Sequence, residues 1–267
     1  MIKFDYHIHT SHSVDCRTPM EEMIEHAISL GLEEIAITDH VDFSYPGNDV
    51  LSPPGVAANI FKMRAMREKY AGDISVLSGV EFNLRPDSAN IIRQIAAAHN
   101  FDIIIGSVHE LGAVDFSFPE YCENRTKREA HGLYLKTVFD AVTACDSWDI
   151  LGHLGYIERY GDYGDKSLAR ADFSDIIDEI LKHVIKSDKG IEINTSGYRY
   201  ALKRPHPNFD IIARYKELGG EIFTVGSDAH STAAMAVGFE EIHTALRNLG
   251  IKYIARFERR RPVFVKI

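Results

Sequence analysis

Seven hydrophobic runs along the chain have the character of β-strands, and each ends in or beside a residue that binds metal ions well. Parallel strands joined by helical crossovers bring their C-terminal ends to one face of a domain. Ligands far apart in sequence would then converge on one pocket, and such a pocket would hold more than one cation. The runs with their terminal residues are Phe4–Ile8 with His7 and His9, Glu34–Thr38 with Asp39 and His40, Ile74–Val80 with Glu81, Ile103–Val108 with His109, Asp149–Leu151 with His153, Ile191–Ile193 with Asn194, and Ile222–Val225 with Asp228 and His230.

Helical patterns lie between these strands. Thr18-Pro19-Met20-Glu21 predicts a capping box with proline at the first helical position, and the helix that follows should stop near Gly31. The alternation of strand and helix predicts a parallel sheet with right-handed crossovers. The further predicted helices are Pro54–Tyr70, Ser88–His99, Lys127–Ala144, Asp172–Ser187, Pro207–Leu218 and Ala233–Leu249.

Two architectures fit this alternation, an open doubly wound sheet and a closed barrel. An open sheet gathers its ligands at one switch point, from few strands. Here nearly every strand end carries a candidate ligand, which favours a closed (β/α) barrel of about seven parallel strands, an α/β fold. Because the sequence shows no linker or shift in composition, we expect residues 1–267 to form one domain. The loops at 41–53, 110–125, 154–171 and 195–206 are long for an α/β unit and should lie on the active face. The last stretch, Lys252–Arg256 and Pro262–Ile267, adds a strand or seals the barrel.

Composition limits the possible partners. The formal net charge is −9, whereas proteins that bind the nucleic-acid backbone usually present a basic face. The one dense basic run, Arg256 with Arg259–Arg261, is expected to be solvated or locally ion-paired. No apolar stretch approaches the ~20 residues of a membrane helix, and the N-terminus carries no signal-peptide pattern. Three cysteines without a C-x-x-C pair predict a reducing, cytoplasmic setting. We therefore expect no nucleic-acid partner and no membrane.

The residue types at the strand ends indicate which metals they would bind. Residues two apart in a strand point to the same side, so His7 and His9 can reach one cation, as can Asp228 and His230. A carboxylate such as Glu81 can bridge two cations with its two oxygens. Imidazole and carboxylate without thiolate suit Zn, Mn or Fe, and the sequence leaves that choice open. The competing interpretation is that these histidines are ordinary core residues. It would require a core histidine to occur by chance at each of six strand-end positions.

These motifs together resemble the PHP (polymerase and histidinol phosphatase) superfamily, most closely its histidinol-phosphate phosphatase branch. The resemblance is carried, in order, by Asp5-Tyr6-His7-Ile8-His9-Thr10, Ile37-Thr38-Asp39-His40, Gly79-Val80-Glu81, Ser107-Val108-His109, Gly152-His153 and Gly226-Ser227-Asp228-Ala229-His230. It implies a distorted (β/α)7 TIM-like barrel with three divalent metal ions. The implied ligands are His7, His9, Glu81 and Asp228 for the first ion, Glu81, His109 and His153 for the second, and Asp15, His40 and His230 for the third.

Such a site serves hydrolysis of a phosphate ester best, by a hydroxide held between two cations that attacks phosphorus. The resemblance implies L-histidinol phosphate as the substrate, with a small phosphate ester such as a nucleotide as the alternative. A metal-binding protein with a degenerate site is a third possibility, disfavoured because every ligand position is filled. Asp228 or His230 would protonate the leaving alkoxide. One of the acids in the loop after His109 would recognise the cationic end of the substrate, with Asp115 preferred over Glu110 and Glu120. The residues expected to hold the substrate are Arg159, Tyr160, Asn194, Ser196 and Arg199, with Arg204 a weaker candidate. Oligomeric state stays open.

Overall fold

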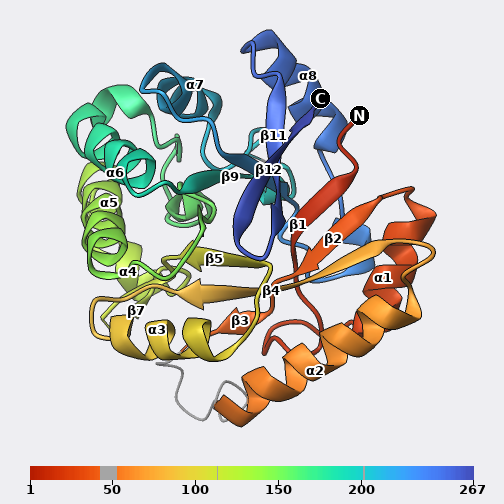
Figure 1. Cartoon of the computed structure of the whole chain (residues 1–267). Coiled ribbons are helices and arrows are strands. Elements are labelled where there is room, and N and C mark those ends of the chain that lie inside the picture. The colour runs from red at the N-terminus through yellow and green to blue at the C-terminus, as the bar shows by residue number, and fades with distance from the viewer. Residues whose placement is uncertain (43–52, 113, 201) are drawn as a thin grey trace.

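Seven parallel strands form a nearly closed barrel in the computed structural model, which describes residues 1–42, 53–112, 114–200 and 202–267 (Figure 1). Neighbouring strands follow the order of the chain, without the reversal that defines a doubly wound sheet. In that order they are β1 (Phe4–Ile8), β2 (Glu34–Ile37), β4 (Ser75–Asn83), β5 (Ile103–Ser107), β8 (Ile150–Leu151), β9 (Gly190–Asn194) and β10 (Phe223–Gly226), while the short β3 (His40–Val41) pairs with β4.

The ring closes between its first and last strands. Ile8 and Ala229 form a parallel bridge. The amide of His9 donates to the carbonyl of Ala229 at 2.9 Å, and the amide of Ala229 donates to the carbonyl of His7 at 3.3 Å. These bonds lie just beyond the last residue of β10, so β1 and β10 meet mainly at their C-terminal ends. The predicted barrel is confirmed, and closure is tightest where the candidate ligands lie.

Helices surround the ring on its outside (Figure 1). The predicted helices are present, with ends that shift by a few residues; the start of the last one is instead a separate 3₁₀ turn at Thr232–Ala234. The α-helices are α1 (Met20–Ser29), α2 (Pro53–Lys69), α3 (Ala89–Ala98), α4 (Pro119–Cys122), α5 (Lys127–Ala144), α6 (Ser174–Lys186), α7 (Phe209–Glu217) and α8 (Phe239–Asn248). Among the described residues, no helix is both long and apolar enough to cross a membrane.

One predicted helix cap was wrong. Pro19, not Thr18, occupies the N-cap position of α1, and no side chain caps this helix. The hydroxyl of Thr18 instead lies 3.5 Å from the carbonyl of His230, so tertiary contacts use it elsewhere. A capping box does form at α5, where Thr126 accepts from the amide of Glu129 and the carboxylate of Glu129 accepts from the amide of Thr126. Thr126-Lys127-Arg128-Glu129 carries the sequence signature of this box.

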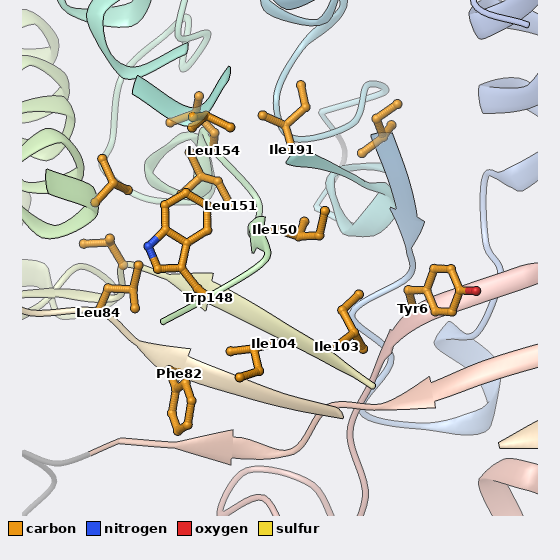
Figure 2. Packing of buried hydrophobic residues seen from close by; sticks show 14 of the residues in the cluster. Tyr6, Phe82, Leu84, Ile103, Ile104, Trp148, Ile150, Leu151, Leu154 and Ile191 are labelled. Carbon is orange, nitrogen blue, oxygen red and sulfur yellow. The ribbon is translucent and has the colours of Figure 1, made fainter. Parts of the chain in front are cut away.

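The core fills the space between strands and helices. Trp148 is fully buried at the start of β8, and its indole nitrogen donates to the carbonyl of Cys145 at 2.7 Å. Figure 2 shows its ring beside Leu84 and Leu151. A Cβ at Gly106 on β5 would lie 3.0 Å from Trp148, so only glycine lets that ring approach the strand. Close packing of this kind holds the strand ends in fixed positions.

The C-terminal stretch forms a separate antiparallel hairpin of β11 (Tyr253–Glu258) and β12 (Arg261–Lys266). Arg256 on it bonds to Glu34 at the start of β2, with Nε 2.8 Å from Oε1. Arg260 bonds bidentately to Asp149 just before β8, with Nη2 2.9 Å from Oδ1 and Nε 3.1 Å from Oδ2. The hairpin therefore seals the N-terminal end of the barrel, opposite the candidate ligands, and crosses the centre of the ring in Figure 1. Local ion pairing was predicted for this basic run, and these two arginines confirm it.

The long loops on the active face are more structured than predicted. Loop 110–125 contains a small hairpin, β6 (Glu110–Leu111) with β7 (Val114–Asp115), and α4. Short 3₁₀ helices at Tyr156–Arg159, Arg170–Asp172 and Thr195–Tyr198 order the loops after β8 and β9. Most of the predicted loop 41–53 lies outside the described residues.

Candidate metal centre and substrate pocket

Glu81 lies at the centre of a buried cluster at the C-terminal ends of the strands. Its side chain, near the end of β4, is fully buried. Oε2 is 3.1 Å from His7 Nε2 and 3.4 Å from His9 Nε2. Oε1 is 2.9 Å from His153 Nε2 and 3.4 Å from His109 Nε2. Oε2 is closer still to His40 Nδ1, at 2.9 Å. The two oxygens of one carboxylate thus face two different groups of imidazoles, the arrangement that a bridging ligand needs.

Asp228 completes the group around His7 and His9. Its Oδ1 lies 3.8 Å from His7 Nε2 and 3.5 Å from His9 Nε2. The backbone of Asp228 has φ of 55°, in the left-handed region that aspartate tolerates better than most residues. On the other side of Glu81, His109 Nε2 and His153 Nε2 are 3.3 Å apart. The structure therefore brings together the residues predicted for the first and second cations.

The residues predicted for a third cation lie beside the first group. Asp15 Oδ2 is 3.0 Å from His230 Nε2 and 3.6 Å from His40 Nε2. The ring of His9 stacks on that of His230 with 4.0 Å between centroids. Nitrogens of His9, His40 and His230 also lie close enough to hold one ion. Asp15 is half exposed, so the third group is more open to solvent than the other two.

Unpaired polar atoms show that this cluster fits bound cations. Within the three groups, four buried ring nitrogens and one carboxylate oxygen make no hydrogen bond among the described residues, although a buried polar atom normally finds a partner. They converge within the groups described above, and their donor types suit Zn, Mn or Fe. These atoms are His7 Nε2, His9 Nε2, His40 Nδ1, His230 Nε2 and Glu81 Oε2.

The charges within the cluster keep its two carboxyl groups, Glu81 and Asp228, in the ionised form. Burial opposes ionisation of Glu81, but the histidines around it, His7 and His40 above all, hold its pKa well below the ordinary value. Burial likewise opposes ionisation of Asp228, and the guanidinium of Arg159 followed by His7 holds its pKa well below the ordinary value. Both carboxyl groups are therefore ionised at neutral pH. Ionised carboxylates are the form that binds a divalent cation.

Two arginines predicted to bind phosphate reach the cluster. Arg159 donates to Asp228 Oδ2 at 2.7 Å and to the hydroxyl of Ser196. Its guanidinium lies over the rings of Tyr156 and Tyr200, 4.6 and 4.7 Å from their centroids, and these contacts restrict its motion.

Arg199 donates mainly to main-chain oxygens, those of Ser227 at 2.6 Å and Asp228 at 2.8 Å. It braces the loop that carries Asp228 and His230. Arg204, the weaker candidate, pairs instead with Glu158 at 3.2 Å.

A cavity of about 590 Å³ opens over the cluster. Asp115 and Tyr160 line its wall together with Arg159 and Arg199, and metal-ligand candidates form its floor. Asn194 and Ser196 are fully buried and are not among the residues that line the cavity; the amide of Ser196 donates to Asn194 Oδ1 at 3.0 Å. These two lie beneath Arg159, where they hold it. The volume suits a small molecule with one phosphate group.

Four residues near the cluster were not identified from the sequence. Glu192 and Ser13 contact the Nδ1 atoms of His7 and His9, at 2.7 and 3.0 Å. Asp42 forms a further possible metal-binding group with His40 and His109. Tyr156 lies against His153, with ring centroids 5.0 Å apart. Asp42 follows His40 at the same two-residue spacing as His7 and His9, and Glu192 alternates with Asn194 along its strand, so both patterns were present in the sequence.

Comparisons with known proteins agree with this geometry. The PHP domain profile matches residues 5–196. The histidinol-phosphatase of Lactococcus lactis is 32% identical over 96% of this chain and 95% of its own length. A probable histidinol-phosphatase of Clostridium acetobutylicum is also 32% identical, over 96% of this chain and 97% of its own length.

A solved structure of the Lactococcus lactis histidinol phosphate phosphatase, in complex with zinc, L-histidinol and phosphate, has a similar fold. It superimposes with a TM-score of 0.89, covers 98% of both chains and is 30% identical in sequence. The resemblance inferred from the strand-end motifs is confirmed: the chain belongs to the PHP domain family.

Proposed function

We propose that this protein is a metal-dependent phosphomonoesterase that hydrolyses L-histidinol phosphate to L-histidinol and phosphate. The observation that carries the proposal is the cavity of about 590 Å³, whose floor is the histidine and carboxylate cluster and whose wall holds Arg159 and Asp115. A relative matched along 98% of this chain binds zinc, L-histidinol and phosphate. The proposal includes cytoplasmic localisation, which the three free cysteines support.

The cluster offers three sets of ligands, and we assign one divalent cation to each. His7, His9, Glu81 and Asp228 would hold the first, Glu81, His109 and His153 the second, and Asp15, His40 and His230 the third. When bound, such cations activate water and offset the charge that develops on the phosphoryl group. Zinc is our first choice among Zn, Mn and Fe, because zinc is bound in the similar structure.

Arg159 would bind the phosphate. Its Nη2 now pairs with Asp228 Oδ2 at 2.7 Å, and a cation on Asp228 would weaken that pairing. The guanidinium could then turn two donors toward phosphate oxygens, the planar arrangement in which arginine binds phosphate best. Contacts with the rings of Tyr156 and Tyr200 would keep the group in place during the reaction.

His230 is the better of the two candidate acids. Asp228 is ionised, because Arg159 and His7 hold its pKa well below the ordinary value, and it carries no proton for the leaving alkoxide. His230 lines the cavity, and about a third of its side chain is exposed. With Nε2 on the third cation, the proton would be on Nδ1, which lies 3.1 Å from the main-chain oxygen of Asp228 and would have to leave that oxygen to reach the leaving group. General acids typically contribute 10²–10⁴-fold to the rate.

Asp115 in the cavity wall would recognise the cationic end of the substrate. Asp115 lines the cavity, and the amide of Ser117 donates to its Oδ1 at 2.7 Å, which leaves Oδ2 for an amine. Glu110 also lines the cavity but is already bonded to Asn83 and Arg85. Of the acids considered, Asp115 therefore has the freest carboxylate oxygen facing this space.

A panel of phosphate esters tests the proposal. Phosphate release is measured for histidinol phosphate, AMP and p-nitrophenyl phosphate, and we expect kcat/KM for histidinol phosphate to exceed the others by about 10²-fold or more. Asp115→Asn should raise KM for histidinol phosphate and leave p-nitrophenyl phosphate unchanged, with Glu120→Gln, an exposed acid of the same loop, as the matched control. Equal or better turnover of AMP would overturn the assignment and favour a nucleotide phosphoesterase.

A further inference from the structure

Glu192 is a buried carboxylate in the barrel wall, and the reaction described above does not use it. It lies on β9, which pairs on one side with β8 and on the other with β10. His153 follows β8 and Asp228 follows β10. Only 1% of Glu192 is exposed, and in the described part of the chain neither lysine nor arginine is recorded as an ion-pair partner for it. A buried charge without such a partner needs other compensation.

Each oxygen of Glu192 contacts a different candidate ligand. Oε1 lies 2.7 Å from Nδ1 of His7, which belongs to the first cation group. Oε2 accepts a hydrogen bond from the main-chain amide of His153 at 2.8 Å, and His153 belongs to the second group. Glu192 on β9 therefore links the backbone position of His153, after β8, to the ring orientation of His7, on β1.

The contact with His7 decides which ring nitrogen can bind a cation. An ionised carboxylate only accepts hydrogen bonds, so Nδ1 of His7 must carry the proton. Nε2, 3.1 Å from Glu81 Oε2, is then the nitrogen that offers a lone pair. Carboxylates that hold the second nitrogen of a ligating histidine fix its orientation and increase its basicity.

We propose that Glu192 is a positioning residue that holds His7 and His153 in the geometry required by the first and second cations. This inference rests on the proposed function, because it assigns those two histidines to bound metal. Glu192 is not itself assigned to a cation, since both of its oxygens are occupied by His7 and His153.

Glutamine has the same shape as glutamate but cannot replace it here. Its amide has one accepting oxygen, whereas the site presents two donors, Nδ1–H of His7 and the amide of His153. Either orientation of the introduced amide leaves one donor facing an NH₂ group. In one orientation His7 would have to turn its lone pair toward that NH₂ group and place its proton on Nε2, where the cation should bind.

Zinc affinity measured without substrate tests this inference. The wild type, Glu192→Gln and Glu34→Gln are compared by competition with a chromophoric zinc chelator. Glu34 is an equally buried glutamate at the other end of the barrel, bonded to Tyr6 and Arg256, so its variant controls for loss of a buried carboxylate. We expect Glu192→Gln to weaken zinc binding about 10–100-fold and Glu34→Gln to leave it unchanged. Equal affinity of Glu192→Gln and wild type would overturn the inference.

A second measurement needs no variant and covers the case in which Glu192→Gln fails to fold. Long-range ¹H–¹⁵N spectra of the zinc-loaded wild type should show the ring proton of His7 on Nδ1. A proton on Nε2 would refute the role of Glu192, whatever the variant does. A wild type that binds no zinc and no other divalent cation would overturn the proposed function itself, whereas a zinc-binding wild type matched by Glu192→Gln would overturn only the positioning role.

Discussion

Replacing Gly226 by alanine should displace His7, a ligand assigned to the first cation, by steric contact alone. Gly226 is the last residue of β10 and faces β1. A Cβ placed there would lie 2.4 Å from Glu192 Oε1 and 2.5 Å from His7 Cβ, where ordinary contact begins at 3.4 Å. The backbone nitrogen of His7 would be 3.2 Å away, so the side chain cannot simply rotate to make room. Strand β1 or Glu192 must shift.

The size of the effect follows from that overlap. Forcing one extra methyl group into a well-packed region typically costs 1–3 kcal/mol. A cost near 2 kcal/mol lowers Tm by roughly 4–8 °C in a domain of about this size, at ~2–4 °C per kcal/mol. Because His7 and Glu192 are displaced together, zinc affinity should also fall by about tenfold, equivalent to ~1.4 kcal/mol.

Circular dichroism of the chelator-treated protein gives Tm, and chelator competition gives the zinc affinity. Gly72→Ala is the matched control, since a Cβ at Gly72 would meet nothing within 4 Å. Surface changes of this kind usually alter stability by less than about 0.5 kcal/mol. If Gly226→Ala had the Tm and zinc affinity of the wild type, the close contact between β1 and β10 would be wrong.

Three further predictions follow from individual contacts. Arg159→Ala should lower kcat/KM for histidinol phosphate by about 10²–10³-fold, whereas Arg204→Ala, whose side chain pairs with Glu158, should change it little; similar losses would contradict the phosphate assignment. Arg260→Ala should lower the free energy of unfolding of the metal-free protein in urea by about 1–3 kcal/mol, because it removes the guanidinium that pairs with Asp149. An unchanged free energy of unfolding would show that the hairpin does not need this bond. Burial lowers the pKa of His131 to about 4, so the unfolded state binds more protons between pH 4 and 6.5 and stability should fall as pH falls through that window. His131→Leu should reduce that acid sensitivity in denaturant titrations, and an unchanged slope would exclude His131 as its source.

The barrel could be predicted because the candidate ligands lie at the ends of the predicted strands. His7, Glu81, His109 and His153 each end or follow an apolar run, and only a closed ring brings all of these ends together. The geometry around Glu81 agrees with the predicted groups, although the assignment of each residue to a cation stays a prediction. Local signals were less reliable. The pattern at Thr18 looks like a cap but its hydroxyl lies near His230, a residue more than two hundred positions away.

The parts that could not be predicted depend on neighbours rather than on sequence spacing. Glu192 alternates with Asn194 along its strand, but this spacing does not show which side chains it meets, and only the folded barrel places it against His7 and His153. Asn194 and Ser196 were expected to bind phosphate directly. The structure places them beneath Arg159, because the turn after β9 lets the hydroxyl of Ser196 donate to Asn194 Oδ1 while it accepts from Arg159.

Elemental analysis of the purified protein, combined with turnover of histidinol phosphate, tests the central claim most directly. The account predicts divalent cations in amounts that approach three per chain, with Glu81 between two of them. It also predicts phosphate release that disappears on treatment with a chelator and returns when the cation is restored. Protein that carries no divalent cation, or that keeps full turnover after complete metal removal, would contradict it.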